Sequence, residues 1–357
     1  MAYISFQPSD YFNTKLYTGN GSTNAITSVG FEPSWTWIKN RGDTHAHVLV
    51  DAVRGVTKEL RSSGTNAEIT TSNSFTSFDS DGFTLGADST DSYNKNTNNY
   101  VSWNWLANGA GSSNTDGSIS STVSANTTAG FSIVKWTGDG TKGATVGHGL
   151  GVKPAMIIAR DYAQSKHWFV YHQKLTDNYV MTLNSNEEEK TGDNYWGSGS
   201  LMKSASSPTT TTFSFNGSGS SITNINGNGY TNIAYCFAEK KGFSKFGSYT
   251  GNGNADGTFV YTGFKPAFVL IKSVSTTNWN MFDNKRSAFN VADETLWANS
   301  SDSESTVGTG YGIDILSNGF KPRSTSSQVN FNNTQMVYMA IAEAPLVGSN
   351  NVPATAR

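Results

Sequence analysis

One glycine-rich phrase in this sequence matches a pattern that can bind a dinucleotide. Gly138-Asp-Gly-Thr-Lys-Gly143 satisfies the GxGxxG pattern. Such a loop must open a helix whose N-terminus meets the pyrophosphate. Here Ala144-Thr-Val-Gly147 follows, and this stretch has no helical character. We therefore interpret the phrase as a glycine-rich turn and expect no nucleotide cofactor.

Acidic side chains could offer oxygen ligands to a metal ion in one segment. Asp79 and Asp81 lie two residues apart, and Asp88 and Asp91 follow shortly after. Calcium takes six to eight oxygens, and loops of β-sandwiches can supply them. Two related segments further along the chain lack the acid of Asp79. We therefore prefer a hairpin turn with solvated acids, and predict no metal.

Histidine, cysteine and glutamate offer weaker signals. His45 and His47 are spaced like a metal-binding pair on a strand, but no third ligand is placed by the sequence. We predict that all five histidines are surface or turn residues: His45, His47, His148, His167 and His172. Cys236 is the only cysteine and lies in an apolar run, so we predict a buried, inert thiol. The run Glu187-Glu-Glu189 reads as a solvated loop. No nucleophile elbow or framed pair of carboxylates is present, so we predict that the chain is not an enzyme.

Aromatic residues remain as candidates for ligand contact. The chain has 9 Trp and 15 Tyr, and aromatic rings can stack on the apolar faces of sugars. Core packing accounts for Trp35, Trp37, Trp103 and Trp105. Four others lie in more variable segments, and we predict that they are exposed sugar contacts: Trp168, Trp196, Trp279 and Trp297.

The elements that would position these residues are repeated along the chain. Tyr17-Thr-Gly-Asn-Gly21 recurs as Trp136-Thr-Gly-Asp-Gly140 and as Tyr249-Thr-Gly-Asn-Gly253. A Gly-x-x-Pro turn follows each copy. Solenoid units span about 20–50 residues, whereas these copies are spaced like whole domains of about 100–150 residues. The spacing predicts three internal repeats.

Each repeat contains short apolar runs bounded by turns. The runs at 34–39, 155–160 and 267–272 are too short for helices, so we predict strands that are buried on both faces. Each run closes with a cation, for which we predict a solvated strand end: Lys39, Arg160 and Lys272. Asx-Gly or Ser-Gly hairpin turns follow further along. The pattern predicts an all-β fold of tandem β-sandwich domains, jelly-roll or concanavalin-like.

Composition limits the partners. Charged residues make up 15% of the chain and the formal net charge is −2, without a basic block, so we expect no nucleic-acid binding. No apolar run is long enough for membrane insertion. The first residues lack the features of a signal peptide, so we expect folding in a cytoplasm.

The repeats suggest domain boundaries. We predict a first β-sandwich at residues 1–110, a Gly/Ser/Thr-rich linker at 111–130, a second sandwich at 131–242, a third at 243–347 and a flexible tail at 348–357.

Several stretches resemble tail-fibre or virion structural proteins of marine tailed phages, cyanophages among them. They include Trp35-Thr-Trp-Ile-Lys39, Asp51-Ala-Val-Arg-Gly55, Val260-Tyr-Thr-Gly-Phe-Lys-Pro266 and Tyr338-Met-Ala-Ile-Ala-Glu343. The resemblance implies a virion location, contacts with other tail or capsid proteins, and a homo-oligomer, with a trimer favoured.

Two functions follow from this resemblance, and a third is more distant. The first is an appendage that attaches to host-surface polysaccharide. The second is a purely architectural head-decoration or tail-connector protein. The third is a polysaccharide-degrading tail enzyme.

Overall fold

The computed structural model describes residues 7–191, 208–215, 225–306 and 310–345. This part of the chain is almost entirely β-structure, which confirms the predicted all-β class. It contains one 3-10 turn, η1 (Pro8–Asp10), and one short helix, α1 (Ser327–Asn330). No helix in the described ranges has the length and hydrophobicity needed to cross a bilayer.

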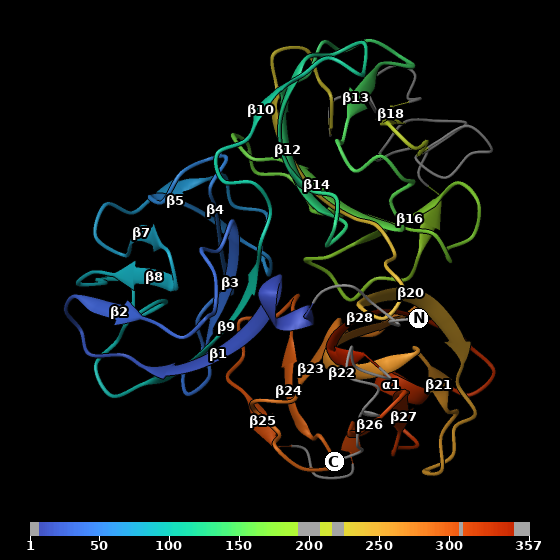
Figure 1. Ribbon diagram of the computed structural model, residues 1–357. Coiled ribbons are helices and arrows are strands. Elements are labelled where there is room, and N and C mark those ends of the chain that lie inside the picture. Colours follow the sequence, from blue (N-terminus) through green and yellow to red (C-terminus); the bar gives the residue numbers. More distant parts are fainter. Residues whose placement is uncertain (1–6, 192–207, 216–224, 307–309, 346–357) are drawn as a thin grey trace.

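Three large antiparallel sheets form the centre of the described structure (Figure 1). The first has the order β1 (Phe12–Thr18), β9 (Asn99–Trp105), β3 (Trp35–Asn40), β4 (Val48–Asp51), β5 (Lys58–Arg61), β6 (Ile69–Thr70). The second has the order β10 (Ser112–Asn114), β11 (Ser121–Asn126), β12 (Phe131–Thr137), β19 (Thr231–Phe237), β14 (Met156–Asp161), β15 (Phe169–His172), β16 (Tyr179–Thr182), β17 (Lys190–Thr191). The third has the order β20 (Ser244–Thr250), β28 (Gln335–Pro345), β22 (Phe264–Ser273), β23 (Asn280–Asp283), β24 (Glu294–Trp297), β25 (Ser305–Thr306). From β1, β12 and β20 onward, the three sheets have the same strand order.

A smaller sheet packs on the outer face of each large one. These are β2 (Asn24–Ile26), β8 (Gly82–Leu85) and β7 (Phe75–Asp79); β13 (Thr145–Gly147) and β18 (Thr212–Ser214); and β21 (Val260–Tyr261), β27 (Gly319–Pro322) and β26 (Ile313–Leu316). In the first pair of sheets, Ile38 and Val50 pack against Phe83 and Leu85. We call residues 12–105, 112–237 and 244–345 the first, second and third units.

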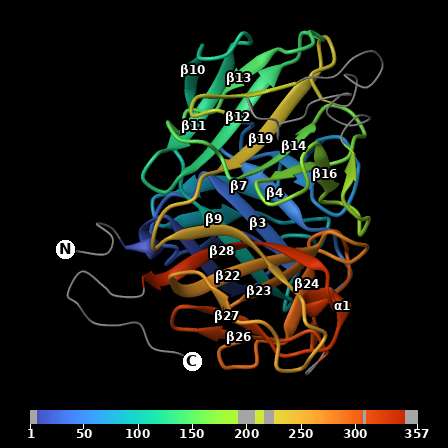
Figure 2. The same cartoon turned by 90° about the vertical axis from the view of Figure 1, so that its right-hand side faces the viewer.

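The inner faces of the three large sheets share one hydrophobic core, which we call the central core. Trp35 stacks on Tyr235 of the second unit at 4.2 Å between ring centroids, and Phe12 lies 5.9 Å from Phe268 of the third. Strands β3 and β14 are buried at every position, which confirms the predicted burial on both faces. Figures 1 and 2 show the three units around this common centre. Burying one such indole contributes on the order of 4 kcal/mol of transfer free energy, so the units stabilise one another.

The segment predicted as a linker, 111–130, is instead part of the second large sheet. Strand β10 pairs with β11, and β11 pairs with β12 from Ser121 to Asn126. The prediction was wrong because this hairpin lies at the sheet edge, where polar Ser, Thr and Asn side chains face water. Ile119 and Val123 are its buried apolar contacts. The predicted tail at 348–357 lies outside the described residues.

Backbone geometry requires both glycines of the repeated Thr-Gly-Asx-Gly phrase. The first glycine of the phrase is Gly19, Gly138 or Gly251. A Cβ there would collide with the backbone of the segment that precedes β9, β19 or β28, respectively. The second glycine has a positive φ of 68°, 70° or 62°: Gly21, Gly140 and Gly253. L-residues with a side chain are strained there. The GxGxxG phrase in the second unit is therefore a turn between β12 and β13, as predicted.

Candidate functional site at the seams between the units

Equivalent backbone hydrogen bonds join the units in a closed ring. The N–H of Glu304 donates to the carbonyl of Arg41 (2.9 Å), Glu68 donates to Tyr162 (2.7 Å), and Glu189 donates to Val274 (2.8 Å). We name these contacts seam 1/3, seam 2/1 and seam 3/2 after the accepting and the donating unit. Each unit accepts at one seam and donates at the next, so the three contacts close into a cycle within the described part of the chain.

A buried cation lies at each seam, where the sequence had predicted a solvated strand end. That prediction was wrong, because all three side chains are fully buried: Lys39, Arg160 and Lys272. Arg160 Nη2 donates to the carbonyls of Thr65 (2.9 Å) and Asn66 (2.8 Å) in the first unit. Lys272 Nζ donates to the carbonyl of Ser275 (2.7 Å). Lys39 Nζ donates to the carbonyls of Asn40 (2.5 Å) and Asp43 (3.2 Å) within its own unit.

Burial lowers the pKa of each of these cations because it penalises the charged form. It lowers the pKa of Lys39 to about 8 and that of Lys272 to about 7. The pKa of Arg160 is lowered to about 10, mainly by burial and secondly by the charge of Arg54. Acidic side chains oppose these shifts: Asp302, Glu304 and Asp43 at Lys39, Asp161 at Arg160, and Glu188 at Lys272.

Two seams contain a buried carboxylate–arginine pair that accepts a hydrogen bond from the next unit. At seam 2/1, Arg54 Nε donates to Asp51 Oδ2 (2.6 Å), and Tyr235 OH donates to the same oxygen (2.8 Å). Burial acts to lower the pKa of Arg54, but the charges of Asp51, Tyr235 and Glu68 and the hydrogen bond to Asp51 together outweigh it, and the pKa is raised. Burial also raises the pKa of Tyr235 well above its usual value. The phenol therefore stays protonated and able to donate.

Seam 1/3 repeats this arrangement with different donors. Arg286 Nε donates to Asp283 Oδ2 (2.5 Å), and Trp103 Nε1 donates to the same oxygen (3.1 Å). Trp103 and Tyr235 stand at the same place in β9 and β19, where both side chains enter the central core.

Seam 3/2 departs from this pattern. His172 and Leu175 occupy the places of the carboxylate and the arginine, and Met339 occupies the place of the donor. His172 Nδ1 accepts from the backbone N–H of Lys174 (3.2 Å), so Nε2 carries the proton and donates to the carbonyl of Tyr338 (3.1 Å). A methionine cannot donate a hydrogen bond, and His172 stands where the other two seams have a buried carboxylate.

Three of the five histidines predicted as surface or turn residues are not on the surface: two lie in loops before β4 and after β13, and the third ends β15. His47, His148 and His172 are buried. His47 Nδ1 accepts from Trp37 Nε1 (2.9 Å), and burial holds the pKa of His47 well below its usual value. Each of the three imidazoles accepts from a neighbouring N–H through Nδ1, which is why burial is tolerated.

The predicted sugar-contact tryptophans do not form an exposed site. Trp168 and Trp279 are buried at seams, where their indole N–H groups donate to the carbonyls of Arg61 (2.7 Å) and Thr182 (2.9 Å) in the preceding unit. Trp297 is half-buried and donates to Asn280 Oδ1 (3.0 Å). Trp196 lies outside the described residues.

The acids considered for calcium each serve their own turn. Asp79 accepts from the hydroxyls of Ser77 and Thr84. Asp81 accepts from the backbone N–H groups of Gly30 and Ser28, which lower its pKa. Within the described ranges, no group of three or more His, Cys, Asp or Glu side chains is arranged to hold a metal ion. Cys236 is buried, as predicted, and burial raises the pKa of its thiol.

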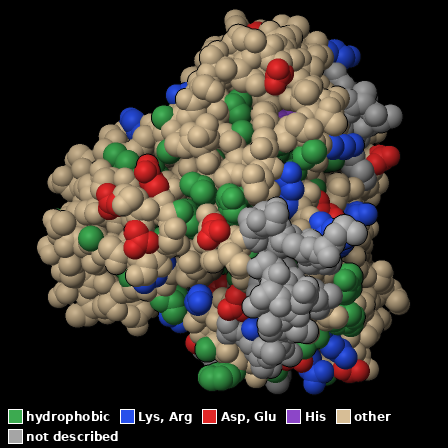
Figure 3. Space-filling model, viewed as in Figure 1, with side chains coloured by type: hydrophobic (Ala, Val, Ile, Leu, Met, Phe, Trp, Pro, Cys, Tyr) green, Lys and Arg blue, Asp and Glu red, His purple; other side chains and the backbone are tan. Residues whose placement is uncertain are grey.

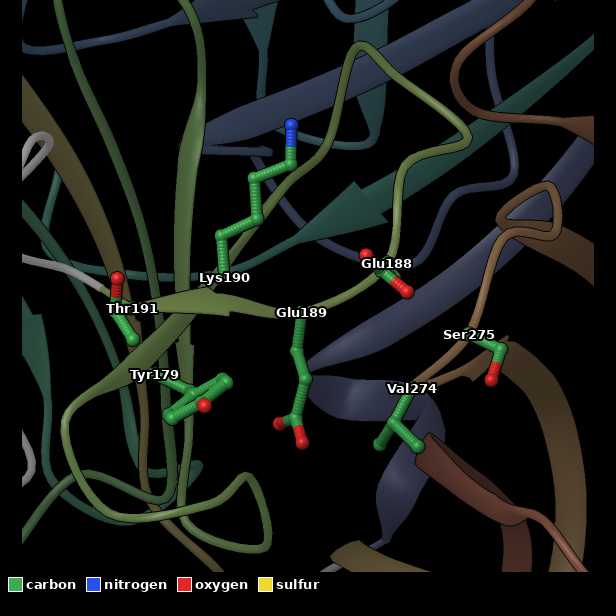
Figure 4. A pocket seen from close by; sticks show the side chains of 7 residues that line it. All are labelled: Tyr179, Glu188, Glu189, Lys190, Thr191, Val274 and Ser275. Carbon is green, nitrogen blue, oxygen red and sulfur yellow. The ribbon is translucent and has the colours of Figure 1, made fainter.

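An open cavity of about 580 Å³ lies at seam 3/2 (Figure 4). Its lining consists of Tyr179, Glu188, Glu189, Lys190, Thr191, Val274 and Ser275. Figure 4 shows Glu189 between Tyr179 and Val274, while Lys190 points the opposite way. Lys190 Nζ donates to Glu187 (2.6 Å), and this hydrogen bond lowers the pKa of Glu187. The carboxylate of Glu189 accepts hydrogen bonds from the backbone N–H (3.1 Å) and the hydroxyl (2.7 Å) of Thr176.

The seams could not be predicted from the sequence, because no residue pattern within a unit shows which units are in contact. The available signal was the repeat itself. The cations next to the last residue of β3, β14 and β22 occupy equivalent positions in the three units. Equivalent positions are also held by His47, Trp168 and Trp279. Such recurrence is expected when equivalent contacts form around an axis.

Comparison with known proteins places these units in one family. A family model described as "Domain of unknown function (DUF7483)" matches residues 7–345. No curated protein and no solved structure matches the chain. The match runs from η1 to the end of β28 and so includes all three units and all three seams. The chain belongs to the DUF7483 family.

Proposed function

We propose that this protein is a structural component of a phage virion, within a tail fibre or another appendage, and that one chain supplies there what three subunits usually supply. The sequence resemblance to virion proteins of marine tailed phages supports the location. The closed ring of three seams supports the architectural role, and it is the observation that carries the proposal.

Symmetry explains how such a ring fits a virion. Homotrimeric assemblies present three equivalent surfaces around an axis. The chain presents three equivalent units around its own axis, joined by Glu304 to Arg41, Glu68 to Tyr162 and Glu189 to Val274. A single copy can therefore sit on the axis of a trimeric partner, in place of the homotrimer expected from the resemblance.

The surface composition fits a structural role. Figure 3 shows a face dominated by uncharged polar side chains and backbone, with charged groups scattered over it. The large aromatic side chains are mostly buried in the central core and at the seams. Rigidity comes from the interior, and the outer loops are left for contacts with other virion proteins.

Attachment to host polysaccharide is the second candidate, and one feature of the third unit favours it. Phe259 and Tyr261, at 46% and 51% exposure, flank the buried Val260 and point outward from β21. The corresponding outward positions beside Ile26 in β2 carry Ala25 and Thr27. The fold does not require aromatic side chains there, so their exposure favours a ligand with apolar faces, such as a sugar.

Particle localisation tests the proposal. Purified phage particles would be analysed by mass spectrometry and labelled with antibody–gold against this chain. We expect stoichiometric protein and labels clustered at one structure of the particle. Absence of the protein from particles that retain the other tail and capsid proteins would overturn the proposal.

A competition assay separates the two roles. Excess purified protein should block adsorption if the chain binds host polysaccharide, and should leave adsorption unchanged if it is purely architectural. Incubation with envelope polysaccharide addresses the polysaccharide-degrading alternative, which requires new reducing ends to form.

A further inference from the structure

The three seams share a set of equivalent positions, and seam 3/2 lacks two of the largest side chains. Strand registers align Arg41 with Tyr162 and Val274. They also align Arg286 with Arg54 and Leu175 through the preceding strands β23, β4 and β15. Val274 and Leu175 therefore stand where seam 1/3 has two arginines.

At seam 1/3, these arginines surround one carboxylate. Arg41 donates to Glu304 Oε1 through Nε (2.8 Å) and Nη2 (2.5 Å). Arg286 Nη1 donates to Glu304 Oε2 (3.0 Å). Both oxygens are thus bound by guanidinium groups, and little of the three side chains is exposed.

At seam 2/1, the equivalent carboxylate also has cationic partners. Glu68 lies 3.1 Å from Arg54 Nη1 and 3.7 Å from Lys58 Nζ. Tyr162 fills the place of Arg41 there. A cation at this carboxylate is therefore a feature of two seams with different sequences.

At seam 3/2, the equivalent carboxylate is Glu189, and its partners are neutral. Its backbone N–H makes the seam bond to Val274, which fixes its position. Its oxygens accept from Thr176, and among the described residues no cation lies within ion-pair distance of Glu189. The cavity opens beside Val274, where a longer side chain would otherwise lie.

The charges around this cavity favour a cation. Glu188 and Glu189 line the cavity, and so does Lys190, whose ammonium group is paired with Glu187. The buried Lys272 donates to backbone carbonyls, including that of Ser275, and the charge of Glu188 acts to raise its pKa, so Glu188 is partly balanced and Glu189 is the acid without a cationic partner among the described residues. The volume of about 580 Å³ falls within the range of roughly 300–1,000 Å³ of ligand pockets.

We propose that the cavity at seam 3/2 binds a guanidinium group, presented by an arginine side chain of a partner polypeptide. The guanidinium takes the place that Arg41 occupies at seam 1/3, and it donates paired hydrogen bonds to Glu189, with Glu188 adding negative charge. The missing arginine of this chain is thereby supplied from outside, which makes seam 3/2 a docking point.

The first test uses the full-length protein and a blocked arginine. Acetyl-arginine amide is titrated by NMR or calorimetry, with acetyl-citrulline amide as the uncharged control of the same shape. We expect saturable binding of the arginine probe that is at least tenfold tighter than that of the citrulline probe and that weakens with salt. Equal binding of the two probes, or no binding, would overturn the proposal.

Three variants of the full chain locate the site. Glu189→Gln should weaken arginine binding at least tenfold, while Glu187→Gln, whose carboxylate is paired with Lys190, should change it less than threefold. Val274→Arg should abolish binding, because its own guanidinium reaches Glu189 as Arg41 reaches Glu304. Unchanged binding in Glu189→Gln or in a folded Val274→Arg would contradict the assignment.

A matched variant at seam 1/3 keeps the proposal falsifiable if Val274→Arg does not fold. Arg41→Val should create an equivalent vacancy there and lower the melting temperature. Acetyl-arginine amide at millimolar concentration should restore part of that loss, and the citrulline probe should not. If both probes act alike, guanidinium recognition by the seam carboxylates is ruled out.

Discussion

The indole N–H of Trp103 in the first unit donates to the buried carboxylate of Asp283 in the third unit, over 3.1 Å. The two residues are 180 positions apart in the chain. The same carboxylate oxygen accepts from Arg286. One residue of a neighbouring unit thus completes a buried ion pair, and the relationship recurs between Tyr235 and Asp51.

Trp103→Phe should destabilise the protein by about 1–3 kcal/mol, because it removes a donor from a buried charged acceptor. Chemical denaturation would measure the change in free energy of unfolding. Met339→Leu is the control at the equivalent place, where no donor exists; it should cost less than about 1.5 kcal/mol. Equal effects of the two substitutions would show that the hydrogen bond contributes little.

Asp51→His should cost about 3–5 kcal/mol, because it removes the buried carboxylate from Arg54, which then keeps only Glu68 as an acidic partner. Adding Arg54→Leu reproduces the pair that the second unit has at His172 and Leu175. The double variant should recover about half of the loss, since neighbouring substitutions couple. Additive losses in equilibrium unfolding would argue against the equivalence of the seams.

Stability should rise with pH between about 7 and 9.5 in a way that depends on Lys272. Its pKa is lowered from 10.5 to about 7 in the folded protein, mainly by burial. The unfolded state therefore binds more protons than the folded state in this window, and the free energy of unfolding increases as pH rises. The slope attributable to Lys272 should be about 1 kcal/mol per pH unit.

Lys272→Met provides the comparison for this prediction. Lys39, with a pKa of about 8, contributes in the same direction, so the difference between wild type and variant isolates Lys272. A wild type and a variant with parallel pH profiles would contradict the assignment.

Gly19→Ala should destabilise the first unit by about 1–3 kcal/mol, because the added Cβ would meet the backbone of Lys95. Gly42→Ala is the control: its nearest neighbours lie 3.8 Å away or further. It should stay within about 0.5 kcal/mol of wild type. Thermal melting would distinguish the two variants, and similar melting temperatures would undermine the account of the repeated turn.

Local patterns predicted much of the fold. The Thr-Gly-Asx-Gly phrases, the strands buried on both faces and the buried Cys236 all follow from composition within a few residues. The seams could not be predicted in this way. Arg160 and Trp168 are buried with hydrogen bonds to another unit, and a strand end or an aromatic residue looks the same whether water or a neighbouring unit covers it.

The prediction of a linker at 111–130 was wrong for a different reason, since this polar segment forms the hairpin of β10 and β11. Its pairing with β12 is made by backbone atoms, which carry no side-chain signal, so its Ser and Thr residues resembled a linker. The cavity beside Val274 could not be predicted either. Its interpretation requires knowing that Val274 and Arg41 stand at equivalent positions in two different sheets.

Phe259→Ala with Tyr261→Thr should leave the melting temperature within about 2 °C of wild type, because both side chains are about half exposed. If the second candidate function holds, phage carrying this double variant should adsorb to host cells at least tenfold more slowly. Normal adsorption would restrict the protein to an architectural role.

Differential scanning calorimetry of the intact chain tests most directly whether the three units form one body. A shared central core and three closed seams predict a single transition, with equal calorimetric and van't Hoff enthalpies. At about 0.7 kcal/mol per residue, that enthalpy should be on the order of 250 kcal/mol. Two or three separate transitions, each with the enthalpy of one unit and unaffected by Trp103→Phe, would contradict the ring.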